Sequence, residues 1–145
     1  MGITDQIVAK GDALLELIPQ RPPMIMIDSL LKVDEKEFET AFTIKGDNIL
    51  LENDRLSEAG LIENVAQTSA AGSGQQYIDK NEPIPLGFIG AVQKLNIFHL
   101  PKIGDTLKTT VTLTHKVMNI SVVKGIVTNG NRVAAQCDMK LFIQE

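Results

Sequence analysis

The sequence predicts an α+β fold in which one central helix is wrapped by an antiparallel sheet of five or six strands. The order of the elements supports this prediction, because two strands, a helix and then three or four long strands follow one another along the chain. The helix is also rich in small residues, which allow a neighbouring backbone to approach it closely. With 145 residues, 43% of them hydrophobic and 22% charged, the chain has the length and composition of a single globular domain over residues 1–145.

The part of the chain before the central helix predicts a helix and two strands. Residues 4–17 have apolar side chains near helical spacing, although Gly11 makes a single continuous helix doubtful. A proline-rich passage then predicts irregular, extended backbone. Residues 24–33 form an apolar run typical of a strand buried on both faces, and residues 38–44 alternate between apolar and polar side chains. The charged segment 34–37 between them indicates a hairpin.

The central helix is predicted to begin after Ser57, whose hydroxyl can cap it, and to continue to Gly72 and Gly74. The segment 46–54 before it shows no period and is expected to be a loop. A helix on the surface would more often carry Glu/Lys pairs on its outer face. We therefore expect this helix to be enclosed by the sheet.

The remainder of the chain predicts long antiparallel strands. The candidates are residues 86–98, 106–117, 120–128 and 132–143, and Asn129-Gly130 between the last two favours a type I′ hairpin turn. One helix cannot cover a sheet of five or six strands. We therefore expect two copies to join their sheets edge to edge as a homodimer, or as a higher oligomer of dimers.

Composition and charge exclude several classes of function. A net charge of −4 argues against a nucleic-acid partner, and no apolar run approaches the roughly 20 residues of a membrane-spanning helix. One cysteine and two histidines make a zinc site nearly impossible, so we expect neither a metal nor a cofactor. Cys137 has apolar companions along its strand and is expected to be inert filling. The amino terminus does not resemble a signal peptide, and a cytoplasmic protein is expected.

Four stretches of the chain, in the same order, resemble motifs of bacterial 3-hydroxyacyl-(acyl carrier protein) dehydratases. Residues 17–28 are similar to L-P-H-R-x-P-x-L-L-x-D, and residues 61–67 to the helix motif L-x-x-E-x-x-A-Q. Residues 87–94 are similar to F-x-x-G-I-x-x-x-x-F, and residues 101–107 to P-x-x-P-G-D-x-L. The double-proline form R-P-P-M at 21–24 is shared with the divergent dehydratase-like proteins of aryl-polyene and flexirubin-type pigment clusters, which this chain resembles most closely.

The resemblance implies a hotdog fold, a long central helix wrapped by a curved antiparallel sheet, and an activity on acyl thioesters. Dehydration needs a base, an acid and donors to the thioester carbonyl. Glu63 matches the family's catalytic carboxylate, which hydrogen-bonds the leaving hydroxyl, and Gln67, one turn later, matches a residue that orients water or that carboxylate. Gly90 and Ala91 match the strand whose amides touch the thioester oxygen. Glu63 could instead cap or bridge at a dimer seam, and Gly90 could mark a bulge.

The other candidate residues concern substrate and partner binding. Gln20 could hydrogen-bond a carbonyl or a water, and Phe88 is expected to line the acyl channel. An acyl carrier protein is strongly acidic, so Arg21, Lys94 and Lys102 are candidates for docking it. Each of these three could equally be an ordinary solvated charge. The expected partners are an acyl carrier protein and the acyl thioester that it delivers.

The chain departs from the family at its catalytic histidine. Ile49 stands where the loop histidine of the fatty-acid-synthesis enzymes would fall, and Gln20 stands where the pigment-type relatives often have one. Turnover would then need Glu63 alone, a histidine from elsewhere, or a base donated by a partner subunit. His115 shares the apolar face of its predicted strand with Leu113 and Val117, and we expect it to be a histidine of the core or of a dimer seam. His99 lies at the end of a predicted strand, outside the family's usual catalytic site.

The sequence thus favours a dehydratase-like hydro-lyase acting on 3-hydroxyacyl thioesters in fatty-acid or polyene pigment synthesis. The alternative is a non-catalytic subunit that binds the acyl thioester or its carrier beside a competent dehydratase. A thioesterase, in which the helix carboxylate activates water, fits the motifs less well.

Overall fold

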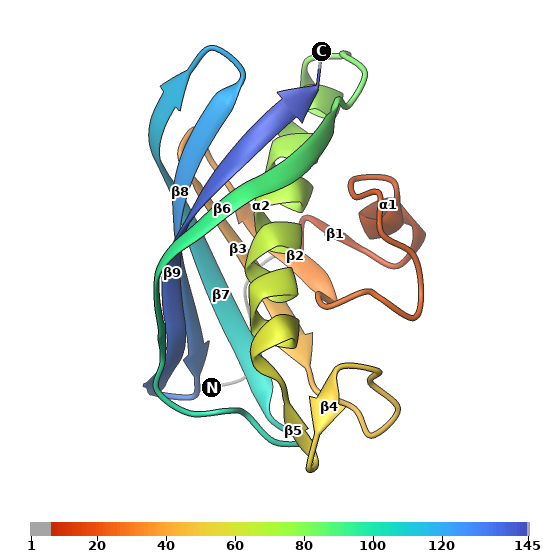
Figure 1. Ribbon diagram of the computed structural model, residues 1–145. Helices are drawn as coiled ribbons and strands as arrows, with labels where there is room; N and C mark the ends of the chain where they lie inside the picture. Colours follow the sequence, from red (N-terminus) through yellow and green to blue (C-terminus); the bar gives the residue numbers. More distant parts are fainter. Residues whose placement is uncertain (1–6, 145) are drawn as a thin grey trace.

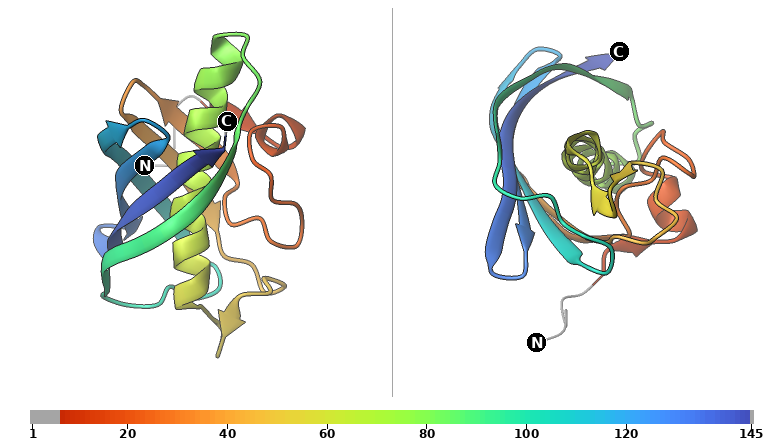
Figure 2. Two further views of the ribbon diagram at one scale, coloured as in Figure 1. Left: turned by 45° about the horizontal axis from the view of Figure 1, so that its top comes forward. Right: turned by 60° about the horizontal axis from the view of Figure 1, so that its bottom comes forward.

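A computed structural model describes residues 7–144 of the chain. Helix α2, Glu58–Asp79, lies at its centre, and an antiparallel sheet curves around the helix in the strand order β1-β2-β3-β7-β8-β9-β6 (Figures 1 and 2). The short helix α1, Asp12–Leu15, lies across α2 from strands β8 and β9 (Figure 1). The sheet strands are β1 Ala9–Lys10, β2 Ser29–Val33, β3 Glu37–Thr43, β6 Leu86–Ile97, β7 Thr106–Val117, β8 Ile120–Asn129 and β9 Arg132–Gln144, and a separate pair consists of β4 Leu51–Glu52 and β5 Arg55–Leu56. The predicted architecture, a central helix wrapped by an antiparallel sheet, is confirmed.

The amino-terminal part differs from the single helix that its apolar spacing suggested. Gly11 has a φ of 59°, a conformation that glycine adopts readily, and it separates strand β1 from helix α1. Ala9 and Lys10 pair with Leu30 and Ser29. This short strand brings the sheet to seven strands, where five or six were predicted.

The strand predicted for residues 24–33 begins only at Ser29. The backbone of Met24 and Met26 is hydrogen-bonded by side chains of α2 and not by a neighbouring strand. The Met26 N–H donates to Gln67 Oε1 at 2.7 Å, and the Met26 carbonyl accepts from Asn64 Nδ2 at 2.8 Å. Side-chain amides thus take the place of a β-ladder here, which the apolar pattern could not indicate. The predicted loop 46–54 likewise contains β4, which pairs with β5.

The long carboxy-terminal strands are confirmed, but the last turn is displaced by one residue. Asn129 pairs with Arg132, so the two turn residues are Gly130 and Asn131. Only Gly130, with a φ of 64°, has a positive φ, whereas a type I′ turn needs one at both positions. The predicted type I′ turn at Asn129-Gly130 is therefore wrong, and a glycine in the first turn position is typical of type II′.

Helix α2 begins as predicted and packs closely against its surroundings. The Ser57 hydroxyl accepts from the Gly60 N–H at 3.3 Å and caps the first turn. The larger apolar cluster lies between α2 and strands β3, β7, β8 and β9, and a smaller one joins α1, β1 and β2 to Ala71. Near the far end of α2, a Cβ added at Gly74 would lie 2.6 Å from the carbonyl oxygen of Leu17. The small residues of the helix therefore permit close approach, as predicted.

A buried polar network also ties α2 to the sheet. The Thr109 hydroxyl donates to Asn64 Oδ1, the Thr68 hydroxyl donates to the Asn64 carbonyl at 2.8 Å, and the hydroxyls of Thr40 and Thr68 lie 2.6 Å apart. All four side chains are fully buried. Because buried polar groups need partners, this network fixes how the helix is rotated against β3 and β7.

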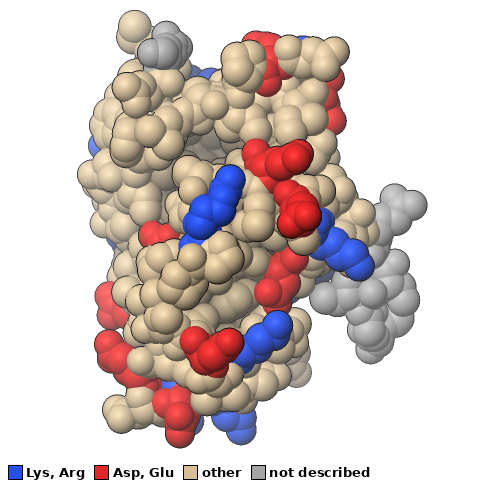
Figure 3. Space-filling model, turned by 90° about the vertical axis from the view of Figure 1, so that its right-hand side faces the viewer, with Lys and Arg blue, Asp and Glu red and all other residues tan. Residues whose placement is uncertain are grey.

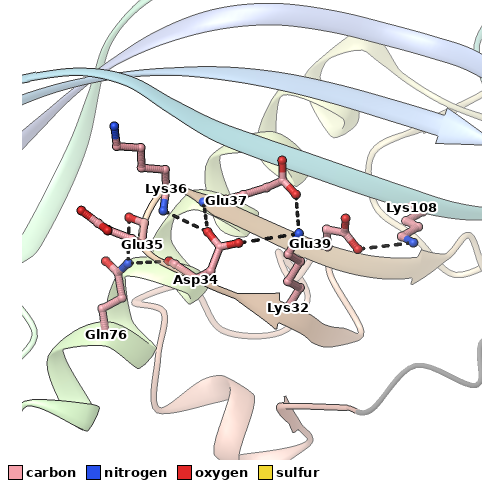
Figure 4. A network of polar contacts seen from close by, with 8 residues as sticks. All are labelled: Lys32, Asp34, Glu35, Lys36, Glu37, Glu39, Gln76 and Lys108. Carbon is pink, nitrogen blue, oxygen red and sulfur yellow. Dashed lines mark hydrogen bonds and ion pairs between the residues drawn. The ribbon is translucent and has the colours of Figure 1, made fainter.

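The hairpin between β2 and β3 is organised by charge (Figure 4). Asp34 Oδ1 accepts from the backbone N–H groups of Lys36 and Glu37 at 3.0 and 2.7 Å, and these hydrogen bonds lower the pKa of the Asp34 carboxyl. The Gln76 side chain, on α2, donates to the carbonyls of Asp34 and Glu35 at 2.9 and 3.3 Å. The hairpin is thereby fastened to the second half of the helix.

A second polar cluster lies where the segment between β6 and β7 meets the end of β8. Asp105 Oδ2 accepts from Asn129 Nδ2 at 2.8 Å, and the same nitrogen lies 3.1 Å from Nε2 of His99. Burial, and then the positive charge of Arg132, lower the pKa of the His99 imidazole. Folding therefore favours the neutral form of the His99 imidazole over the protonated form.

Gly74→Ala should lower the free energy of unfolding by about 1–2 kcal/mol. The new methyl group would press on the Leu17 carbonyl, and this overpacking outweighs the gain in helix propensity. Urea denaturation measures the change. Gly46→Ala is the control, because a Cβ there meets nothing within 4 Å. Equal stabilities of the two variants would contradict the described packing.

The stability of the fold should decrease as the pH falls below about 6.5, partly through His99. In that range the unfolded chain takes up a proton on this histidine while the folded chain, whose His99 pKa is lowered, does not. Urea denaturation at about pH 7.5 and about pH 5 would show the loss, and His99→Gln should make it smaller. An identical pH dependence in parent and variant would refute the assignment.

Candidate functional site

Glu63 and Gln67 form a hydrogen-bonded pair one turn apart on α2. Gln67 Nε2 donates to Glu63 Oε1 at 2.9 Å and to the Met24 carbonyl at 2.8 Å. With its Oε1 accepting from Met26, the Gln67 side chain is fully engaged, and it is 0% exposed. Glu63 is partly buried, and its second oxygen, Oε2, has no hydrogen-bond partner within residues 7–144. The arrangement orients one carboxylate and leaves one of its oxygens available for chemistry.

A cavity of about 340 Å³ lies beside the second half of α2. Its wall is formed by α2, by the ends of the long strands and by the segment before β2. The lining residues include Gln20, Ala66, Ser69, Ala70, Phe88 and Leu141. Its volume is within the range of small-molecule sites, and most of its wall is apolar.

Of the six residues predicted to act in catalysis or substrate binding, the cavity includes two and leaves out four. Gln20 and Phe88 line it, as expected for substrate-binding residues. Glu63, Gln67 and the Gly90-Ala91 pair are not among the lining residues, and on α2 the wall begins at Ala66, three residues beyond Glu63. The carboxylate is therefore not part of the cavity wall, and Ala66, three residues later on the same helix, is the wall residue of α2 nearest to it in the sequence.

Gln20 is held in place by its neighbour. Arg21 Nη1 donates to the carbonyls of Ile18 and Gln20 at 2.8 and 2.7 Å, which fixes the backbone on either side of Pro19. The Gln20 Oε1 atom is buried but has no hydrogen-bond partner within the described chain. The cavity wall thus contains a hydrogen-bond acceptor, Gln20 Oε1, to which no group of the described chain donates.

Gly90 marks an irregularity in the edge strand β6, the alternative noted from the sequence. The ladder with β9 pairs Ile89 with Leu141 and Ala91 with Lys140, so Gly90 is skipped. A Cβ at Gly90 would lie 1.9 Å from the ring of Phe142, and packing of that ring explains the glycine. A role of the Gly90 and Ala91 amides in holding a carbonyl stays a prediction.

The three basic residues considered for carrier docking lie on different segments, each with a local partner. Arg21 binds backbone carbonyls, Lys94 of β6 lies 3.8 Å from a carboxylate oxygen of Asp138, and the backbone N–H of Lys102 donates to Asp105. On the face shown in Figure 3, acidic and basic side chains are interspersed. The structure thus brings together no basic patch from these residues.

The histidines and the cysteine do not supply an evident catalytic base. Neither His99 nor His115 lines the cavity. His115 is exposed and follows a register shift in the β7–β8 pairing between Leu113 and His115, so a core position is wrong, while a position at a subunit seam stays a prediction. Ile49 is 50% exposed. Burial raises the pKa of the Cys137 thiol to about 11, which agrees with inert filling.

Sequence reasoning missed three hydroxyls in the cavity wall, those of Ser69, Ser73 and Ser121. Ser69 and Ser73 are four residues apart on α2, a spacing that places both on one side of the helix and that could have been noticed. Ser121 could not, because it reaches the cavity only through the pairing of β8 with β9.

Two further features concern the described residues as a whole. No cluster of three or more His, Cys, Asp or Glu side chains in this part of the chain could hold a metal ion. None of its helices has the length and hydropathy that crossing a bilayer requires.

Comparison with solved structures shows close similarity of fold at low sequence identity. The dehydratase heterocomplex ApeI:P from Xenorhabdus doucetiae matches with a TM-score of 0.84 at 17% identity, covering 91% of each chain. The PaaI protein from the phenylacetic acid degradation operon of E. coli matches with a TM-score of 0.64 at 16% identity, covering 78% of this chain and 80% of the other. A hypothetical thioesterase from Streptococcus pneumoniae, solved with coenzyme A, matches with a TM-score of 0.65 at 14% identity, covering 79% and 84%.

These likenesses confirm the predicted hotdog fold. A comparison with curated protein sequences gave no match. The sequence model of the ApeP dehydratase family, described as ApeP-like, matches residues 13–145, nearly the whole chain. The chain therefore belongs to the ApeP-like dehydratase family.

Proposed function

We propose that this protein is a dehydratase subunit that acts on 3-hydroxyacyl thioesters delivered by an acyl carrier protein. The observation that carries the proposal is a helix carboxylate, Glu63, that is oriented by Gln67 and lies three residues before Ala66, where α2 begins to line a largely apolar cavity. Membership of a dehydratase family supports the reaction class. A cytoplasmic place in fatty-acid or polyene pigment synthesis belongs to the same proposal.

The reaction removes the C2 proton and expels the C3 hydroxyl as water. Glu63 can serve both steps, because a carboxylate that takes the C2 proton becomes the acid that protonates the departing hydroxyl. Gln67 holds Oε1, so the transfer falls to Oε2. The thioester carbonyl accumulates negative charge during the step, and the amides of Gly90 and Ala91 are the proposed donors to it.

The exposed edge of the sheet supports assembly with a second hotdog subunit. Strand β6 is the last strand of the sheet, and its Leu86, Phe88 and Ile89 side chains are 45%, 53% and 40% exposed. Unpaired edges with exposed apolar side chains favour pairing with another chain. We propose that this partner is a second copy or a related dehydratase subunit, and that it contributes to the site next to Glu63.

Carrier docking is the least constrained part of the proposal. Arg21 follows Gln20 directly, so its charge lies at the segment that forms the cavity wall. We propose that the acidic carrier protein docks on the surface around Arg21, with Lys94 and Lys102 as further candidate contacts.

A non-catalytic role has one specific observation in its favour. No histidine lines the cavity, and the two histidines of the sequence, His99 and His115, lie elsewhere. In this alternative the protein would bind the acyl chain or the carrier and support a competent dehydratase. A thioesterase remains the third candidate, since a carboxylate on the helix could activate water.

Glu63→Gln should reduce dehydration on the order of a hundredfold or more, because the amide cannot exchange protons. Mass spectrometry of purified protein incubated with 3-hydroxyacyl and trans-2-enoyl carrier thioesters measures interconversion in both directions. Glu58→Gln is the matched control, since it makes the same charge change on an exposed residue of the same helix and should leave the rate nearly unchanged.

The same assay separates the three functions. Interconversion that depends on Glu63 supports the dehydratase, and release of the free acid supports the thioesterase. Binding without chemical change supports the accessory role. Full dehydration by the Glu63→Gln protein would reject Glu63 as the catalytic group.

A further inference from the structure

Among the described residues, two buried side-chain atoms that could form hydrogen bonds have no partner, and one of them belongs to the cavity. These atoms are Gln20 Oε1 and His99 Nδ1, and only Gln20 lines the cavity. Native proteins satisfy nearly all buried polar atoms, so an exception in the wall of a binding cavity points to a group that arrives from outside.

The surroundings of Gln20 make this acceptor a fixed feature. Its backbone carbonyl accepts from Arg21, the preceding Ile18 is buried, and Met24, after the two prolines, is bonded to Gln67. The side chain therefore starts from a backbone held at several points. A carbonyl oxygen presented in this way can accept one hydrogen bond from a ligand without first giving up another partner.

Helix α2 adds further polar groups to the same wall. Ser69 and Ser73 bring hydroxyl groups from one side of α2 to the same cavity, and neither side chain has a hydrogen-bond partner in residues 7–144. The rest of the wall is largely apolar, with contributions from Leu17, Phe88 and Leu141. A purely hydrocarbon chain would leave these polar atoms unsatisfied.

We propose that Gln20 is a specificity-determining residue that accepts a hydrogen bond from a hydroxyl group carried by the acyl chain. The inference rests on the proposed function in one respect, that the cavity receives an acyl group. Two positions of this hydroxyl are distinguished by experiment: at C3, where Gln20 favours the hydroxyacyl substrate over the enoyl product, and at the far end of the chain. In both cases an acyl group without a hydroxyl leaves Gln20 Oε1 unpaired and binds more weakly.

Isothermal titration with three pantetheine amides tests the proposal: octanoyl, 3-hydroxyoctanoyl and 8-hydroxyoctanoyl. The amide linkage makes the C2 proton less acidic than in a thioester, so binding is measured without turnover. The parent protein should bind one hydroxylated amide about fivefold more tightly than the octanoyl amide, the worth of one neutral hydrogen bond. Which of the two it prefers identifies the position of the hydroxyl.

Gln20→Met should remove this preference while leaving the affinity for the octanoyl amide nearly unchanged, because methionine has similar length but accepts only weakly. Gln20→Glu, which keeps acceptor oxygens at the same reach, should retain it. Gln75→Met is the matched control, since Gln75 makes the same change of side chain outside the cavity wall and its amide nitrogen bonds only the nearby Asp79. The control should keep the full preference.

Equal binding of all three amides by the parent would overturn the role of Gln20 and leave the acyl site standing. A preference that persists in Gln20→Met, or that disappears equally in Gln75→Met, would also overturn it. Absence of binding by all three would instead reject the acyl site itself. If the protein prefers a hydroxylated amide but catalyses no dehydration, the proposed catalytic function is rejected and the role of Gln20 stands.

Discussion

The structure depends on two side-chain amides of the central helix, those of Asn64 and Gln67. Both are fully buried, and together they hydrogen-bond the backbone of Met24 and Met26, which has no strand partner of its own. A backbone segment buried without such partners would be strongly unfavourable. Side chains of the helix therefore supply the hydrogen bonds that a neighbouring strand would otherwise make. They also fix the position of the segment before β2 along the helix.

The same interaction determines the candidate site. Gln67 uses one N–H for the Met24 carbonyl and the other for Glu63, so the carboxylate is oriented by the contact that closes the fold. Met24, which Gln67 bonds, lies only four residues after Gln20. The same hydrogen bond therefore also helps to position Gln20 in the cavity wall. Fold and site share these hydrogen bonds, which is why Glu63 and Gln20, 43 residues apart in the sequence, belong to one region.

The proposed function links assembly to catalysis. Glu63 lies three residues before the first cavity residue of α2, β6 ends the sheet with exposed apolar side chains, and no histidine lines the cavity. In the proposed function a partner subunit covers that edge and completes the surroundings of the carboxylate. This arrangement accounts for a family member whose own chain lacks the expected histidine.

The sequence by itself determined the class of fold, the start of the long helix, the four long strands after it and the resemblance to dehydratases, whereas the helix runs to Asp79, beyond the predicted end at Gly74. These features rest on local periodicity and on short motifs, which are properties of neighbouring residues. The resemblance also indicated Glu63 and Gln67 as candidate site residues, and their spacing of four on a helix places the two side chains on one face.

The tertiary structure alone decided where the polar side chains of the helix find their partners. The start of the apolar run, at Met24 and Met26, looked like a strand, but its backbone bonds side-chain amides some 40 residues later in the sequence, a pairing that no local pattern contains. The exposure of His115 depends on a register shift, and the unpaired oxygen of Gln20 depends on which segments surround it. Each of these follows from contacts between distant parts of the chain, because burial and hydrogen-bond satisfaction are properties of the packed molecule.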